Sequence, residues 1–238
     1  MVTDGRFSPP KPTGPDAAHT AARALLSAIP YVGGPLAEAF NAAVSPPLQR
    51  RRDQWMEDVA SALDELTNKA NITLEQLLSN EQFLDTLLQA TQAAIRTHVA
   101  EKREALRNAT VNAALPASPD EALQSMFISL VDQFTVWHLR LLKYAQDPRR
   151  WFQELQGFLP DVNEPAPEVV FPMAFPEASV SSDFLMQVWN DLFQRGLVVQ
   201  SRPAQWVHPH ELDKATSPLG DQMLSFIQQP PRGLGDAA

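Results

Sequence analysis

The middle of the chain reads NEQFLDTLLQATQAAIRTHVAEKREALRNATVNAAL, residues 80–115. Apolar side chains recur in this stretch every three or four residues, which is the spacing of one buried face of an α-helix. Asn80 belongs to the residue types that cap helix N-termini. The pattern therefore predicts one helix from Asn80 to about Leu115, with roughly 34 residues and a length of about 50 Å. Such a helix would be the spine of the fold.

Shorter helices are predicted before this stretch, between prolines and glycines. Pro46 and Pro47 should end one helix, and Pro47 can begin the next, where its missing N–H would have no partner in any case. Thr73, with Gln76 three residues later, forms a capping box for a short helix. The expected helical ranges are 23–29, 35–44, 47–69 and 73–78.

The second half of the chain predicts more helices with clear start signals. Residues 118–121, SPDE, combine a cap, a first-turn proline and acids near the positive end of the helix dipole. Ser182 is expected to cap a helix that ends at Gly196. Between these helices, a proline-rich crossing at 159–178 should lie along the body of the protein. The remaining expected helices cover 135–146, 148–158 and 218–227.

Two short runs, LVVQ at 197–200 and QWVH at 205–208, indicate a β-hairpin. From residue 135 on, the expected order is helix, helix, helix, hairpin, helix, which is the chain order of a winged helix. The predicted fold class is therefore mainly α, with an N-terminal helical bundle built on one long helix and a C-terminal winged-helix-like region with a small β-hairpin. The expected division is a disordered leader at 1–20, the bundle at 21–134, the winged-helix-like region at 135–229 with its insert at 159–178, and a disordered tail at 230–238.

Composition excludes several classes of function. The chain has 238 residues, of which 44% are hydrophobic, so it can bury a substantial core. Its net charge of −9 argues against a general nucleic-acid coat, which must neutralise phosphates. It contains no cysteine, which excludes disulfides and thiolate chemistry. The first residues lack the pattern of a secretory signal, so we expect a cytoplasmic protein in which the Asn-X-Thr triplets at Asn71 and Asn108 carry no glycan.

The candidate partner-binding residues are Arg50, Arg51, Arg52, Arg96, Arg103 and Arg107. The first three occupy consecutive helix positions, so they wrap the exposed side of their helix. The last three lie on one side of the predicted long helix, at intervals of two turns and one turn. Such a line of charge can bind a phosphate or an acidic partner. It can equally pair with Glu101, Glu104 and acids on neighbouring helices.

Charge also bears on the winged-helix-like region. A winged helix that reads DNA inserts its third helix into the major groove. Here that helix, residues 182–195, contains Asp183 and Asp191, and Arg195 is its only base. Arg202 is the only base that the hairpin adds. Charge therefore disfavours DNA and favours contact with protein through this region.

No catalytic motif stands out, and we predict no catalytic residue, no cofactor and no metal. His208 and His210 flank one residue of an extended segment, so both imidazoles can face one ion, as a metal-dependent hydrolase would require. Glu211 and Asp213 lie nearby, but a tight site needs a third ligand and an ordered surrounding shell, and this segment leads from the hairpin towards a helix cap. His98 and His138 are interpreted as structural residues.

The stretch ALLSAIPYVGGPLAEAFNAAV, residues 24–44, carries no charge before Glu38. It is broken by proline and glycine, and each apolar arm is far shorter than the ~20 residues that span a bilayer. Three interpretations stay open: a helical corner packed within the fold, a surface for a partner or a second copy, and a membrane contact that does not span.

Several segments, taken together, resemble a type of bacterial protein. They are GGPLAEAF, SPPLQRRRDQWMEDVASALDEL, EKREALRNATVNAAL, LQSMFISLVDQFTVWHLRLLKYAQDP, DLFQRGLV and SPLGDQMLSFI, between residues 24 and 229. Their order resembles the abortive-infection alpha type, with a glycine-rich start, a helical body and a small winged C-terminal region. The resemblance implies a non-enzymatic helical protein linked to phage defence or mobile elements, with no catalytic residues to carry over. We therefore predict an interaction or regulatory protein that acts through protein contacts or self-association. A winged-helix DNA-binding transcriptional regulator is the alternative.

Overall fold

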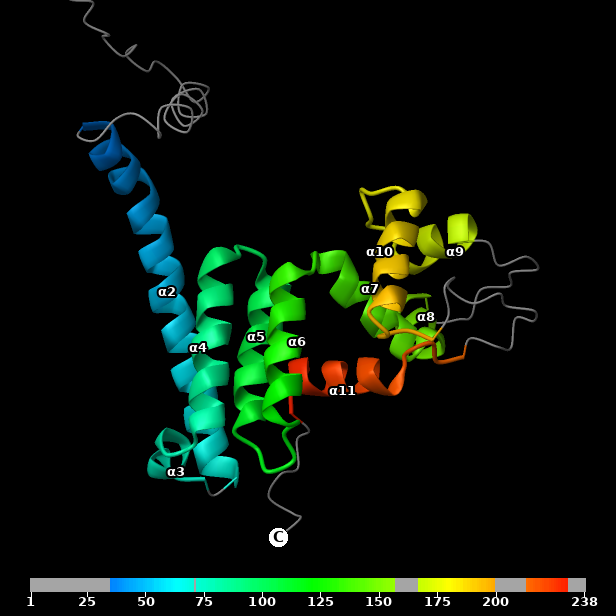
Figure 1. Ribbon diagram of the computed structural model, residues 1–238. Helices are drawn as coiled ribbons and strands as arrows, with labels where there is room; N and C mark the ends of the chain where they lie inside the picture. The colour runs from blue at the N-terminus through cyan, green and yellow to red at the C-terminus, as the bar shows by residue number, and fades with distance from the viewer. Residues whose placement is uncertain (1–34, 71, 157–166, 200–212, 231–238) are drawn as a thin grey trace, which may run out of the picture. The chain divides into compact units, whose positions relative to one another are not determined.

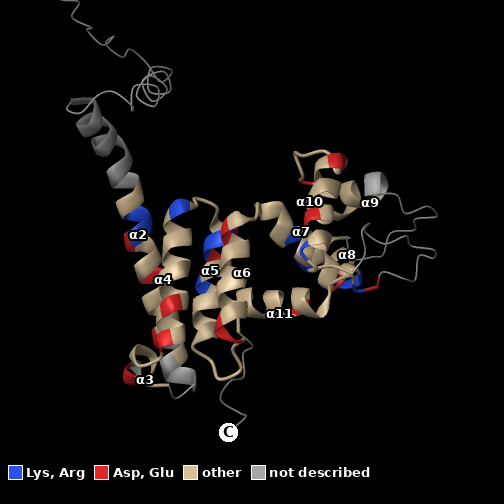
Figure 2. Ribbon diagram, viewed as in Figure 1, with Lys and Arg blue, Asp and Glu red and all other residues tan. Residues whose placement is uncertain are grey.

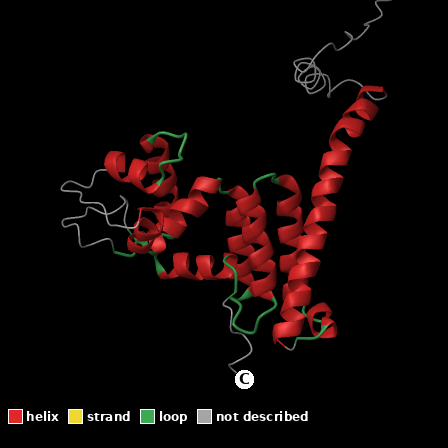
Figure 3. Cartoon of the chain, turned by 180° about the vertical axis from the view of Figure 1, so that it is seen from behind, coloured by secondary structure: helices red, strands yellow, loops and turns green. Residues whose placement is uncertain are grey.

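Figure 1 shows the computed structural model of the chain, which describes residues 35–70, 72–156, 167–199 and 213–230. The chain divides into two compact units, residues 1–50 and residues 51–238. The described residues are mainly helical, as predicted, and Figure 3 shows their helices joined by loops. No helix among them is both long and apolar enough to pass through a bilayer. The helix expected at 23–29 and the leader at 1–20 lie outside the described residues, and the predicted domain boundaries stay predictions.

The helices of the first half are α2 (Pro35–Ala70), α3 (Leu74–Leu78), α4 (Glu81–Arg96), α5 (Ala100–Ala113) and α6 (Glu121–Gln133). Those of the second half are α7 (Val136–Gln146), α8 (Pro148–Gln156), α9 (Pro167–Ala174), α10 (Ser182–Gln194) and α11 (Pro218–Ile227). We call α4, α5 and α6 the helical bundle, because these three pack against one another. The part of α2 that belongs to the second unit packs on this bundle through Trp55. The buried indole N–H of Trp55 donates to Thr91 Oγ1 at 2.9 Å.

The predicted spine is wrong, because it is two helices rather than one. α4 ends at Arg96, and the backbone is extended at Thr97 (φ −103°, ψ 141°) and at Val99 (φ −75°, ψ 116°) before α5 begins. The two helices fold back on each other and bury small side chains, namely Ala90, Ala93 and Ala94 of α4 and Ala105, Ala109 and Ala113 of α5. A straight helix would leave much of this surface in water, so burial outweighs helix continuity here. Two of the three residues between the helices, Thr97 and Val99, are β-branched, which lowers their helix propensity.

The predicted helix end at Pro46 and Pro47 is also wrong, because α2 is continuous from Pro35 to Ala70. Proline lacks an N–H and crowds the preceding turn, yet its fixed φ near −65° is itself a helical value. The two prolines therefore cost backbone hydrogen bonds without forcing the chain out of the helix.

α11 is held against the bundle by two buried asparagines of α5. Asn108 Nδ2 donates to the carbonyl of Ile227 at 3.2 Å, and Asn112 Nδ2 donates to those of Phe226 at 2.7 Å and Gln228 at 2.8 Å. The last carbonyls of a helix have no partner within it, so these amides satisfy groups that would otherwise be buried unpaired. Burial of Asn108, 4% exposed, also removes it as a glycan acceptor. α11 contacts α6 and α7 as well as α5, so it joins the two halves of the second unit.

The second half has an aromatic core between α7, α8 and α9. The Tyr144 ring lies edge-on to those of Trp151, Phe152 and Phe175, with centroid distances of 5.7–6.1 Å. Trp151 Nε1 donates to the carbonyl of Ala174 at 2.8 Å. The proline-rich crossing contains α9, which was not predicted as a helix. Its apolar residues are buried between 170 and 175, so the prediction that it lies along the body is confirmed there.

The predicted hairpin is only partly within the described residues. Val198 and Thr216 form an antiparallel bridge. The Val199 N–H donates to the Ala215 carbonyl oxygen at 2.9 Å, and the Ser217 N–H donates to the Leu197 carbonyl oxygen at 3.0 Å. Residues 197–199 thus pair with 215–217. The predicted partner strand at 205–208 lies outside the described residues.

Most helix starts agree with the predicted caps. The Thr73 capping box and the Asn80 cap are present, with Asn80 Oδ1 accepting the Phe83 N–H at 3.1 Å. Two caps shift by a residue or two. Asp120 rather than Ser118 caps α6, and Ser181 rather than Ser182 caps α10. Gly196 ends α10 with a positive φ of 72°, as predicted.

Candidate partner-binding site

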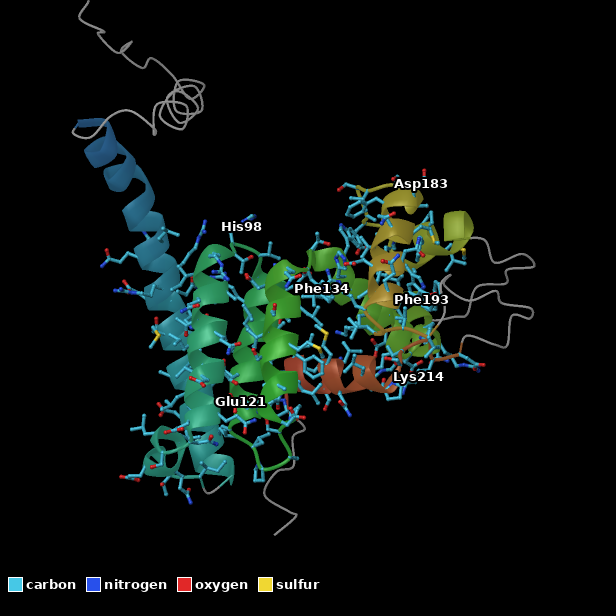
Figure 4. The ribbon with its side chains drawn as sticks, viewed as in Figure 1. His98, Glu121, Phe134, Asp183, Phe193 and Lys214 are labelled. Carbon is cyan, nitrogen blue, oxygen red and sulfur yellow. The ribbon has the colours of Figure 1, made fainter. Side chains whose placement is uncertain are left out.

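The site residues lie on α2 and at the α4–α5 end of the bundle. Figure 2 shows lysines and arginines on this end and acidic residues around α3 and the starts of α4 and α6. In Figure 4, His98 marks the α4–α5 turn and Glu121 marks the start of α6 at the opposite end. The lysines and arginines of the helical bundle therefore lie towards one end, where Glu101, Glu104 and Asp132 also lie, whereas the charged residues of the opposite end are acids.

Arg96 and Lys102 are occupied by the bundle itself. Arg96 Nη2 lies 2.6 Å from Asp132 Oδ2, and Lys102 Nζ donates to the Asp132 carbonyl oxygen at 2.8 Å. Burial lowers the pKa of Lys102, and the negative charge of Asp132 partly opposes that shift. These two cations bind the end of α4 and the start of α5 to the end of α6. Arg96 therefore does not lie in line with Arg103, as it would on one continuous helix.

Arg103 and Arg107 lie one turn apart on α5, and neither has a carboxylate partner among the described residues. Arg103 Nη1 donates to Gln54 Oε1 of α2 at 3.3 Å, and Arg107 Nη2 donates to Asn108 Oδ1 at 3.3 Å. The Arg107 Nε is buried and has no acceptor in the described part of the chain. Both guanidinium groups are thus bound only to neutral amides, through long hydrogen bonds.

The bond from Arg103 to Gln54 places α5 beside the part of α2 that belongs to the second unit. Arg51 lies three residues before Gln54 and so on the same side of α2. Arg52 Nη2 lies 3.7 Å from Asp53 Oδ1, but both side chains are more than half exposed, so solvent weakens this ion pair. Arg50 is exposed and belongs to the first unit. We call Arg51, Arg103 and Arg107 the arginine face.

Of the two named acids that can pair with this face, Glu101 is bound elsewhere and Glu104 forms no ion pair with a described residue. Arg140 of α7 binds Glu101, with Nη2 2.5 Å from Oε1, and lies 3.5 Å from Glu177. Its guanidinium also lies over the Trp137 ring, 5.0 Å from the centroid. Glu104 is exposed and forms no ion pair within the described ranges. The arginine face therefore keeps its positive charge.

A second polar cluster lies where α7 meets α10, and sequence reasoning missed it. His138 Nε2 lies 3.1 Å from Asp191 Oδ2, which also accepts from Arg195 Nε at 3.0 Å. His138 Nδ1 lies 2.9 Å from Thr135 Oγ1 and accepts the Thr135 N–H at 3.2 Å. The His138 ring stacks on Phe134, with centroids 4.6 Å apart. A capping box with histidine at its fourth position was the available signal, since Thr135 and His138 have that spacing.

This hydroxyl, imidazole and carboxylate resemble a catalytic arrangement, but the hydrogen bonds assign them to the fold. The Thr135 N–H occupies the Nδ1 lone pair that a general base would need. Arg195 binds the same carboxylate one turn along α10, and its guanidinium lies over the Phe134 ring, 5.3 Å from the centroid. Burial lowers the pKa of His138, with Asp191 opposing and Arg195 and Lys102 adding to the shift. The imidazole is therefore a neutral link between two helices.

The described residues contain no group of three or more histidines, cysteines and acids that could hold a metal ion. His208 and His210 lie outside the described residues, so the metal hypothesis stays a prediction. In comparisons with known proteins, no family model, no curated protein and no solved structure matches this chain.

Proposed function

We propose that the chain is a non-enzymatic interaction protein of the bacterial cytoplasm that binds an acidic protein surface through its arginine face. The observation that carries the proposal is the state of Arg103 and Arg107. Each is bound only to a neutral amide, although salt bridges satisfy the arginines of α4 and α7 nearby. Like charges one turn apart on a helix repel each other, and a bound acid would relieve that repulsion.

The chemistry of the face favours carboxylates over apolar partners. Hydrogen bonds between guanidinium and carboxylate are shorter and about twice as strong as those to neutral acceptors. Arg103 and Arg107 project from one side of α5, so two acids one turn apart on a partner helix would match their spacing. The planar guanidinium group can also bind a carboxylate through two parallel hydrogen bonds, which makes the contact directional as well as strong.

The winged-helix-like arrangement of α7 to α11 is part of the proposal. The bridge between Val198 and Thr216 joins the chain after α10 to the chain before α11, as a wing would. The charge of this region favours a packing or protein-contact role, because residues 135–238 contain 8 lysines and arginines against 12 acids. A link to phage defence or mobile elements rests on the sequence resemblance alone.

The test is capture of partners from the native cells. Tagged wild-type chain is cross-linked in the cells and purified, and co-purified proteins are quantified by mass spectrometry. The double variant Arg103→Gln/Arg107→Gln should lose the partner, whereas Arg149→Gln/Arg150→Gln, which changes two exposed arginines of α8, should keep it. If the same proteins come down with both variants, the arginine face is not the binding site.

The DNA-binding alternative has its own measurement. It is a gel shift with a mixed-sequence DNA duplex at low salt. Low salt favours any contact with phosphate, because protein–DNA affinity falls steeply as the salt concentration rises. We expect no shift, since Asp183 and Asp191 lie on α10 and Arg195 is bound to Asp191. A shift that disappears when Arg195 is replaced would support the regulator instead.

A further inference from the structure

The end of the bundle opposite the arginine face is acidic. Its acids are Glu75 of α3, Glu81 and Asp85 of α4, and Asp120 and Glu121 at the start of α6. The sequence contains no lysine or arginine from Asn71 to Ile95 or from Asn108 to Leu139, so these segments supply no cation to neutralise them. We call these five residues the acidic end.

Hydrogen bonds between α4 and α6 hold the acidic end together. Gln82 Nε2 donates to the Pro119 carbonyl at 3.0 Å, and Thr86 Oγ1 donates to Gln124 Oε1 at 2.6 Å. The starts of α4 and α6 are therefore adjacent, and Glu81 and Glu121 are exposed there. None of the five acids forms an ion pair with another described residue. Acids near helix N-termini are stabilised by the helix dipole, but that interaction leaves their charge open to a partner.

Exposed apolar side chains accompany these acids. Leu88 lies three residues after Asp85 on α4 and is 57% exposed, and Leu78 at the end of α3 is 59% exposed. Interfaces combine apolar contact with charge at the rim, and this end of the bundle has both. It therefore has the composition of a contact surface.

From this complementarity we infer that the partner of the arginine face is the acidic end of a second copy of the chain. The inference rests on the proposed function and names the partner of the same site. The two surfaces differ and lie at different places on one chain, so the contact is head-to-tail. Two bound copies then keep one free arginine face and one free acidic end between them, so further copies can add, in an open row or, where the rotation closes, in a ring.

The ionic strength decides whether such contacts form. The net charge of −9 makes whole chains repel each other. At about 0.1 M salt the Debye length is about 10 Å, so repulsion between distant parts is screened while charges in direct contact still attract. At about 0.5 M the contacts are weakened as well. Association should therefore be measurable near 0.1 M salt and fall at least about tenfold in affinity at 0.5 M.

Sedimentation velocity of the full chain, over a concentration series at both salt concentrations, tests the inference. Wild type should form species larger than a dimer as concentration rises near 0.1 M salt. Arg103→Gln/Arg107→Gln and Glu81→Gln/Glu121→Gln should each be monomeric. An equimolar mixture of the two should form a 1:1 dimer and nothing larger, because only one complementary pair of surfaces remains.

Controls separate failure to fold from failure to bind. Arg149→Gln/Arg150→Gln should associate like wild type. The glutamates of the acidic end are exposed, so their replacement leaves the core intact, and the far-UV spectrum of each variant verifies this. A monomeric wild type at all concentrations, or variants that still associate, would overturn the inference. The capture experiment would then test the proposed function separately. The proposed function is supported if Arg103→Gln/Arg107→Gln loses a different protein partner, and it is contradicted if that variant loses none.

Discussion

Asn112 offers the sharpest test of how the two halves of the second unit are joined. Its amide nitrogen donates to the carbonyls of Phe226 at 2.7 Å and Gln228 at 2.8 Å, and that of Ser225 lies at 3.3 Å. The side chain is 8% exposed, so water does not replace it easily. Asn112→Ala removes both strong bonds and leaves carbonyls at the end of α11 without a donor.

The expected loss follows from the two bonds. A hydrogen bond contributes about 1 kcal/mol net, but a buried carbonyl left without a partner costs about 1–3 kcal/mol. With relaxation of the end of α11, we expect the free energy of unfolding to fall by about 2–4 kcal/mol. Asn112→Asp should be worse, because it places a carboxylate against carbonyl oxygens in place of a donor.

Urea unfolding followed by far-UV circular dichroism measures this loss. Ser129→Ala is the control, since it removes an exposed hydroxyl of α6 whose hydrogen bond from Gln133 Nε2 is itself exposed, and it should change the stability by less than about 0.5 kcal/mol. If Asn112→Ala is as stable as wild type, α11 is not held by its C-terminal carbonyls and the account of the join is wrong.

Three further predictions concern the core. The free energy of unfolding should fall as pH drops below about 6.5, because burial lowers the pKa of folded His138 and the unfolded chain then binds the proton more readily. Urea titrations of wild type and His138→Gln should show a weaker pH dependence in the variant. Tyr144→Phe should leave the melting temperature unchanged or raised, because the buried Tyr144 hydroxyl has no partner among the described residues, and a clear loss of stability would reveal one. Gly220→Ala should lower the free energy of unfolding by about 1–3 kcal/mol in urea, because its Cβ would lie 2.1 Å from the Leu197 carbonyl oxygen. In Gly196→Ala the new Cβ meets no atom within 4 Å, so this substitution should cost about 1 kcal/mol through its positive φ alone.

Local signals in the sequence predicted helix starts well. Thr73 with Gln76, and Asn80 with its apolar run, fix their caps through residues at most three apart. Such hydrogen bonds need no distant partner, so a short window contains the information. The mainly helical class follows from the same periodicity.

Tertiary contacts decided what the sequence could not predict. The turn at Thr97 contains neither glycine nor proline, and α5 packs on α4 because both helices bury alanines against each other. The residues that pair after α10 come from 215–217, well beyond any short window. The contact of His138 with Asp191 spans 53 positions.

The arginine face shows the same limit. Regular spacing predicted a line of Arg96, Arg103 and Arg107, but that line required one continuous helix. The turn assigned Arg96 to Asp132 and left Arg103 beside Gln54 of α2 and Arg107 beside Asn108. The residue types were therefore informative, whereas the grouping depended on the fold.

Site-specific photocross-linking at position 54 tests the central claim most directly. Gln54 is exposed and touches Arg103, so a photoreactive amino acid there lies within the arginine face. We predict a covalent product with a protein, which a mass measurement identifies as a second copy or another chain, and its loss in Arg103→Gln/Arg107→Gln. The same probe at exposed Ser129 should give little product. Equal products at both positions, or none at position 54, would contradict the claim that this face binds a protein.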